Sequence, residues 1–309
     1  MFIPTLIGVS LVIFLLLRVM PGDVAAAILG GPSGEGTFTE EDVIKVTQEL
    51  GLDRPIYIQY LDWMWGLVRG DLGTSFVLNK PIFEEFQRQV PVTLQLGVIA
   101  FTTIILTSIP IGIIAAVKQD GLADYFLRGF SIFALAIPTF FLGLLLILVM
   151  SRFFNWLPPL GFSHIWVNPS SAIQQMVPAA IALGIHSSGL LMRLTRTQLL
   201  ECMREDYIRT ARAKGVAEKV VIIRHGLRNA LLPIITYAGF QFGVLFSGTV
   251  VIELIFNLPG IGRGLLDALF LRDLPTIQAY IMYFAFVSLA INLVVDLTYA
   301  WLDPRIRYE

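Results

Sequence analysis

The feature that most constrains this chain is a series of apolar runs, each about as long as a membrane is thick. A bilayer core of about 30 Å requires about 20 helical residues. Runs of this length occur at six places, and only Arg18, Glu253 and Asp296 carry a formal charge inside them. The pattern predicts an all-α membrane protein with six transmembrane helices, at 2–20, 91–117, 129–150, 172–192, 233–256 and 276–302.

Composition agrees with a membrane location and excludes several classes of chemistry. The chain is 56% hydrophobic and only 15% charged, whereas soluble domains average about 25% charged residues. A single cysteine, Cys202, cannot form an internal disulfide, and three scattered histidines lack metal-ligand spacing. No G-x-x-x-x-G-K-[ST] phosphate loop occurs. We therefore expect no bound cofactor or metal and no ATP hydrolysis by this chain, which is not expected to be an enzyme.

The distribution of lysine and arginine predicts the orientation in the membrane. The loops 118–128 and 193–232 and the segment after 302 together carry thirteen basic residues, whereas the short loops on the other side carry three. Because basic loops remain cytoplasmic, both termini are predicted to lie in the cytosol. The first run could instead be a cleaved secretory signal, but its length and the lack of a basic start favour a span.

The polar segment 21–90 is then an extracytoplasmic excursion between spans 1 and 2. It opens with a glycine-rich stretch at 30–36, and Thr39 with three following acids reads as a helix cap. One helix is expected to end near Gly51 and a second to cover 56–68. The predicted organisation is a first helix at 1–20, the excursion at 21–90, a five-helix core at 91–302 with a cytoplasmic loop at 197–232, and a cytoplasmic tail at 303–309.

The cytoplasmic loop between spans 4 and 5 is too regular to be only a connector. Helix formers fill 201–214, Gly215 interrupts them, and apolar residues recur at helical spacing over 216–231. A basic loop held against anionic lipid would explain the charge but not the glycine-hinged helix pair. A nucleic-acid patch fits less well still. Apolar Tyr207, Ile208 and Ala211 lie beside arginines, a pattern that suits docking into the groove of a partner protein.

This loop resembles the coupling segment of permease subunits in bacterial ATP-binding-cassette importers. DYIRTARAKG at 206–215 and RHGLRNALLP at 224–233 are similar to the dipeptide, oligopeptide and nickel branch. The resemblance covers nearly the whole chain, with further matching segments LLLRVMPGD at 15–23, LGLDRPIYIQYLDW at 50–63, GDLGTSF at 70–76, FNLPGIGRGLLDA at 256–268 and LDPRIRY at 302–308.

The resemblance implies a type I ABC importer permease fold in the prokaryotic inner membrane. It also implies partners: a second, similar permease subunit, two ABC ATPase subunits or domains, an extracytoplasmic substrate-binding protein and the lipid bilayer, with no nucleic acid. ATP binding to the ATPases would drive alternating access through the docked loop. The expected coupling residues are Tyr207, Ile208, Ala211, Gly215 and Val220, with Ala211 and Gly215 at the contact.

Two features inside the spans are further candidates. Gly239, Gly243 and Ser247 stand four residues apart in the fifth span, a spacing that lets another helix approach closely. Glu253, near the outer end of the same span, could line the translocation pathway, or it could be a structural partner of an arginine such as Arg263.

Other functions are less consistent with the sequence. An ion-coupled secondary transporter would be expected to show paired acids or broken helices in two related repeats, whereas the sequence has no internal repeat and no mid-span ion pair. A membrane protease would need a motif such as H-E-x-x-H. The cargo stays open between dipeptides, oligopeptides, glutathione-like compounds and nickel chelates, and so does the pairing of identical or different permease subunits.

Overall fold

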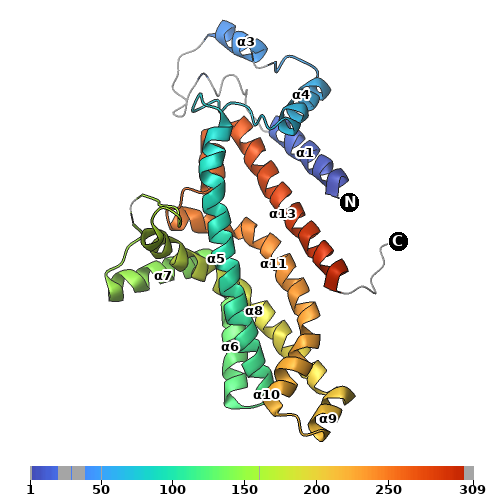
Figure 1. Ribbon diagram of the computed structural model, residues 1–309. Coiled ribbons are helices and arrows are strands. Elements are labelled where there is room, and N and C mark those ends of the chain that lie inside the picture. Colours follow the sequence, from blue (N-terminus) through green and yellow to red (C-terminus); the bar gives the residue numbers. More distant parts are fainter. Residues whose placement is uncertain (1, 20–28, 30–38, 50, 160, 303–309) are drawn as a thin grey trace. The chain divides into compact units, whose positions relative to one another are not determined.

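A computed structural model describes residues 2–19, 29, 39–49, 51–159 and 161–302 (Figure 1). The predicted glycine-rich stretch at 30–36 and the tail at 303–309 lie outside these residues. Every regular secondary-structure element in the described part of the chain is a helix. One isolated β-bridge joins Thr74 to Pro81. The predicted all-α class is confirmed.

Four helical stretches of the described chain are long and apolar enough to cross a membrane. Each contains most of a predicted span, but α5, α8 and the stretch Glu218–Ile255 continue well beyond the predicted spans into the flanking polar sequence. A further apolar helix, α1 (Phe2–Val19), is shorter, with 18 residues. The four stretches are α5 (Ile82–Val117), α8 (Pro169–Met203), the continuous stretch Glu218–Ile255 and α13 (Leu274–Leu302).

The predicted third span is not one straight helix. It is divided into α6 (Leu122–Ala136) and α7 (Thr139–Phe154), which meet at 107°. Pro138 causes the break, because proline forces the preceding residue out of the helical region, and Ile137 is extended at φ −84° and ψ 124°. His186 Nδ1 lies 2.8 Å from the Ile137 carbonyl oxygen freed by the break. With this pair counted as one span the described residues hold five spans, so the count of six is not confirmed.

The chain divides into two compact units, and the first comprises Met1–Val92 with Pro259–Leu289. Its helices α3 (Glu40–Glu49) and α4 (Ile56–Val68) confirm the two helices predicted in the excursion. At the start of α3 the Thr39 N–H and hydroxyl donate to Asp42 Oδ2 at 2.9 and 2.7 Å. Both hydrogen bonds lower the pKa of Asp42, the backbone one more than the one from the hydroxyl. The Asp42 carboxylate therefore stays ionised near neutral pH.

Within this unit α4 packs on α1 through polar and aromatic contacts. Ser10 Oγ and the Tyr60 hydroxyl lie 2.9 Å apart, and the Phe14 ring contacts those of Tyr60 and Trp63. The start of α13 is fixed by Asp273, a buried residue that accepts hydrogen bonds from Ser75 Oγ, the Phe76 N–H and Thr276 Oγ1. This carboxylate therefore connects the loop before α5 to the first turn of α13. A short helix, α12 (Ile261–Leu271), precedes it.

The second unit comprises Thr93–Leu258 with Ala290–Glu309 and is organised around α8. This helix makes its most extensive contacts with α11 (Arg228–Ile255) and α6, and it also contacts α7. Glycines allow these approaches. A Cβ atom on Gly189 would lie 2.5 Å from the Ser131 carbonyl oxygen of α6, and one on Gly184 would lie 3.0 Å from the Ala100 carbonyl oxygen of α5.

The close approach of α6 and α8 predicts the effect of one added methyl group. Gly189→Ala should force the helices apart, because backbone atoms cannot yield locally, and we expect a loss of about 1–3 kcal/mol of stability. Gly129→Ala in α6 is the control: its Cβ meets nothing within 4 Å, and alanine favours a helix by about 0.5–1 kcal/mol over glycine. Thermal unfolding in detergent measures both, and equal midpoints for the two variants would contradict this packing.

Candidate functional site

The most distinctive polar structure of the second unit is a short helical hairpin between α8 and α11. It consists of α9 (Asp206–Ala213), a turn at Gly215, α10 (Glu218–Val220) and the π-helix η1 (Val221–Leu227), and is called the 206–227 hairpin below. Only two residues separate its start from the end of α8, and η1 continues directly into α11. The predicted helix, glycine turn and helix are confirmed.

The turn of the 206–227 hairpin depends on the backbone of Gly215. This residue has φ +73°, a left-handed conformation that costs other residues about 1–2 kcal/mol. The Gly215 N–H donates to the Arg212 carbonyl at 3.0 Å and the Val216 N–H to the Ala211 carbonyl at 3.3 Å, the hydrogen bonds of a Schellman cap. A Cβ atom on Gly215 would meet nothing within 4 Å, so conformation rather than space requires glycine.

Two further interactions close the hairpin. Ile208, Ala211 and Val221 form a buried apolar cluster, against which Met203 and Val216 pack. On the outside, Arg212 donates to both carboxylate oxygens of Glu218, from Nε at 3.1 Å and from Nη2 at 2.7 Å. These hydrogen bonds raise the pKa of Arg212. Because both side chains are exposed to solvent, the pair contributes little, and the apolar cluster is the larger contribution.

The structure divides the five predicted coupling residues into two groups. Tyr207 and Val220 are 39% and 41% exposed, and Gly215 is exposed as well. Ile208 is fully buried and Ala211 is only 8% exposed. Of the three residues predicted to form an apolar docking face, Ile208 and Ala211 therefore pack inside the hairpin, and Tyr207 is the accessible member.

The Tyr207 hydroxyl lies near Asn229 at the start of α11 and Cys202 on α8. Partial burial of the phenol raises the pKa of Tyr207, so the group is neutral near pH 7. Beside the hairpin lies a cavity of about 360 Å³, lined by Arg212, Glu218 and Ile222 together with the ends of α5 and α8.

A buried ion pair that the sequence analysis missed lies in the same unit. Arg196 on α8 donates to both oxygens of Asp124 on α6, from Nε and from Nη2, each at 2.7 Å. Arg128 Nε lies 3.6 Å from Asp124 Oδ1. Asp124 is fully buried, and such a charge is tolerated only when it is paired. Opposite charges next to two neighbouring spans were the signal available in the sequence.

The small residues predicted for helix packing have different environments. Val295 on α13 lies so close to Gly239 that any Cβ there would overlap its side chain, and Gly243 is buried. Ser247 is exposed. Gly239 and Gly243 therefore lie where helices pack closely, whereas Ser247 does not within the described chain.

Glu253, the candidate pathway residue, is fully buried on α11. Thr93 Oγ1 on α5 donates a hydrogen bond of 2.7 Å to its Oε1 atom. A buried, hydrogen-bonded acid is compatible with either of the two roles predicted for it. Among the described residues no group of three or more histidine, cysteine or acidic side chains is arranged to hold a metal ion.

Comparison with known protein families covers nearly the whole chain. Residues 108–308 match the family described as binding-protein-dependent transport system inner membrane component, and residues 2–97 match the N-terminal family of the same membrane components. The second match includes α1 and the excursion, and the first includes the 206–227 hairpin.

Curated relatives agree with the family match. The dipeptide transport system permease protein DppB of Escherichia coli K12 is 38% identical, covering 99% of this chain and 96% of that protein. The glutathione transport system permease protein GsiC of Escherichia coli O6:H1 is 39% identical with the same coverage. These values greatly exceed those needed to show common descent.

A solved structure shows the same fold. It is a crystal structure of an amino acid ABC transporter with histidines, with a TM-score of 0.54 at 14% sequence identity, covering 71% of this chain and 94% of that chain. Sequence and fold thus lead to one conclusion: this chain belongs to the family of inner membrane components of binding-protein-dependent transport systems.

Proposed function

We propose that this chain is the permease subunit that forms half of the translocation pathway of an ATP-driven peptide importer, and that the 206–227 hairpin receives the force of ATP binding. The observation that carries the proposal is the folded hairpin itself, held between α8 and α11 in a chain of the transport family. A basic loop that only met lipid would need neither a Schellman-capped turn nor a buried cluster.

The cargo proposed is a peptide or a related small solute. The two relatives described above are named for dipeptide and glutathione transport, and both solutes carry a peptide backbone. Nickel chelates, which the sequence resemblance left open, gain no support from these names. The alternative of an ion-coupled secondary transporter gains none either.

The proposed partners are those of the transport system. They are a second permease subunit, two ABC ATPase subunits and an extracytoplasmic substrate-binding protein. In this arrangement α1 and the bent pair of α6 and α7 each count as one of six spans, both termini face the cytosol, and the excursion 21–90 faces outward. Closure of the ATPases would move the hairpin and switch the spans between inward-facing and outward-facing states. Glu253, which is buried against Thr93, is proposed to have a structural role, with a place along the pathway as the alternative.

Within the hairpin, exposure decides which residues contact the ATPase. Tyr207, Gly215 and Val220 are accessible and form the proposed contact surface. Ile208 and Ala211 are buried and act as positioning residues, since they hold α9 against η1.

Docking by the hairpin predicts that a charge at Val220 disrupts assembly. Val220→Asp should lower the amount of ATPase subunit that co-purifies with the permease by about tenfold or more, because a carboxylate would be desolvated in the contact. Val167→Asp is the matched control: Val167 is 71% exposed just before α8, at the end of that helix opposite to the hairpin. Equal recovery of ATPase with both variants would argue against docking at the hairpin.

The left-handed turn predicts a second effect, on coupling. Gly215→Val should strongly reduce ATP-coupled uptake by the reconstituted complex, because a β-branched residue disfavours φ +73°. Gly215→Asn should retain most of the uptake, because asparagine tolerates this conformation. Uptake that is unaffected by valine would show that the turn geometry does not transmit force.

The proposed orientation predicts opposite labelling of two engineered thiols. In a Cys202→Ser background, Lys219→Cys should react with a membrane-impermeant thiol reagent only in inverted vesicles, and Asp53→Cys only in intact cells or right-side-out vesicles. Both positions are exposed, the first in the hairpin and the second between α3 and α4. Labelling of both from the same side would overturn the topology.

A further inference from the structure

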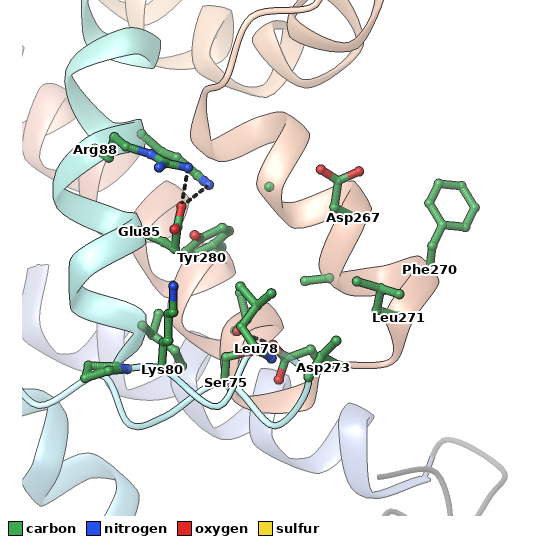
Figure 2. A pocket seen from close by; sticks show the side chains of 17 residues that line it. Ser75, Leu78, Lys80, Glu85, Arg88, Asp267, Phe270, Leu271, Asp273 and Tyr280 are labelled. Carbon is green, nitrogen blue, oxygen red and sulfur yellow. Dashed lines mark hydrogen bonds and ion pairs between the residues drawn. The ribbon is translucent and has the colours of Figure 1, made fainter. Parts of the chain in front are cut away.

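A pocket lies in the first unit, outside everything discussed so far. Its volume is about 550 Å³, within the range of pockets that bind small molecules. The loop before α5 and the first two turns of α5 form one side, and α12 and the start of α13 form the other (Figure 2). In the proposed topology both chain segments face outward, so the pocket is open to the extracytoplasmic space.

The floor of the pocket is apolar. Ile82, Ala268 and Tyr280 are buried, and the Tyr280 ring contacts that of Phe86. Leu78, Phe270 and Leu271 are partly exposed at the rim. Asp273 also lines the pocket, but its carboxylate already accepts three hydrogen bonds, from Ser75, Phe76 and Thr276. It is therefore not assigned a role in ligand binding.

Opposite charges stand on the two sides of this floor. Figure 2 shows Lys80, Glu85 and Arg88 on the α5 side and Asp267 on α12 across from them. Glu85 and Arg88 neutralise each other at 2.9 Å, whereas Lys80 forms no ion pair with any residue that the structure describes. Asp267 forms one long ion pair among the described residues, at 3.8 Å with Arg263. A cation and an anion are thus available to a ligand at separate points.

One buried polar atom in the lining also lacks a partner. Gln89 Nε2 lies 3.5 Å from Glu85 Oε2, while Gln89 Oε1 is buried and accepts no hydrogen bond within the described part of the chain. An unsatisfied buried acceptor costs about 1–3 kcal/mol. Because this oxygen packs against Gly264, the Gln89 side chain has to turn toward the pocket before a ligand N–H group can donate to it and remove the cost.

We propose that this pocket binds a short peptide with free termini, as an extracytoplasmic subsite of the importer. The peptide carboxylate pairs with Lys80, the ammonium group pairs with Asp267, an N–H group donates to Gln89 Oε1, and an apolar side chain rests on the floor. The peptide class rests on the proposed function, and the site rests on the geometry of the pocket. Peptide would reach this subsite without any action of the ATPase.

The test measures peptide binding to the full chain in nanodiscs of phosphatidylcholine, with no nucleotide and no ATPase present. The probes are alanyl-phenylalanine, its N-acetyl derivative and its C-terminal amide. Loss of one charged contact is expected to weaken binding about ten- to a hundredfold, so both derivatives should bind less well than the free dipeptide. Because no ATP is involved, an absence of peptide binding in this test would not contradict the proposed ATP-driven transport. Conversely, a failure of ATP-coupled uptake would not change the binding that this test measures.

Two charge variants assign each contact. Lys80→Gln should weaken binding of the free dipeptide but not of the amide, and Asp267→Asn should weaken binding of the free dipeptide but not of the N-acetyl form. Lys45→Gln, at an exposed lysine on α3 outside the pocket, should change none of these affinities. Leu78→Trp, at a partly exposed rim position, should reduce binding of all three probes by filling the pocket.

Three results would overturn the proposal. They are equal affinity for the three probes, affinity for the free dipeptide that neither Lys80→Gln nor Asp267→Asn alters, and no binding at millimolar peptide. A phosphatidylethanolamine headgroup also carries an ammonium and an anion. If phosphatidylethanolamine in the nanodisc abolishes dipeptide binding and the two variants relieve this competition, the pocket is a lipid site instead.

Discussion

The constraint on which this structure depends is the absence of water from the bilayer core. Every backbone N–H and carbonyl group at that depth needs a partner within the protein, and helices supply it for each residue in turn. Where the helix stops at Ile137 before Pro138, the freed carbonyl oxygen lies 2.8 Å from His186 Nδ1. The same demand applies to side chains: Thr93 donates to the buried Glu253. In the proposed topology, His186 on α8 thus offers a partner to one carbonyl group that the break frees.

A second consequence is that apolar surface cannot hold the helices together, since lipid is as apolar as leucine. The leucine and phenylalanine side chains of α5 to α7 are largely exposed, as expected if they face lipid. Contact between helices instead uses small residues, which let backbones approach. Gly184 and Gly189 bring α5 and α6 against α8, and Gly239 brings α13 against α11. The buried Asp124 and Arg196 pair adds a polar connection between α6 and α8.

The sequence predicted the features that are encoded locally. The caps and helices of the excursion and the turn at Gly215 follow from neighbouring residues, so α3, α4 and the hairpin are where they were expected. The 107° break was not predictable, because Pro138 tells of a kink but its size depends on distant partners such as His186. The pairing of Asp124 with Arg196, 72 residues away, is likewise non-local. The burial of Ile208 and Ala211 was missed because an apolar face looks the same whether its own chain or a partner covers it.

The internal packing of the 206–227 hairpin determines how a force on it would be transmitted. Met203 and Leu199, at the end of α8, pack against Gly226 of η1, where a Cβ atom would lie 2.8 Å from the Met203 sulfur. The hairpin therefore contacts α8 along its return path as well as at its start, and η1 continues into α11 without a break. A push on Tyr207 or Val220 cannot bend the hairpin without disrupting the cluster around Ile208. In the proposed mechanism such a push displaces α8 and α11 together, and α6 with them through Asp124, so these contacts favour movement of a rigid helix group over local flexing.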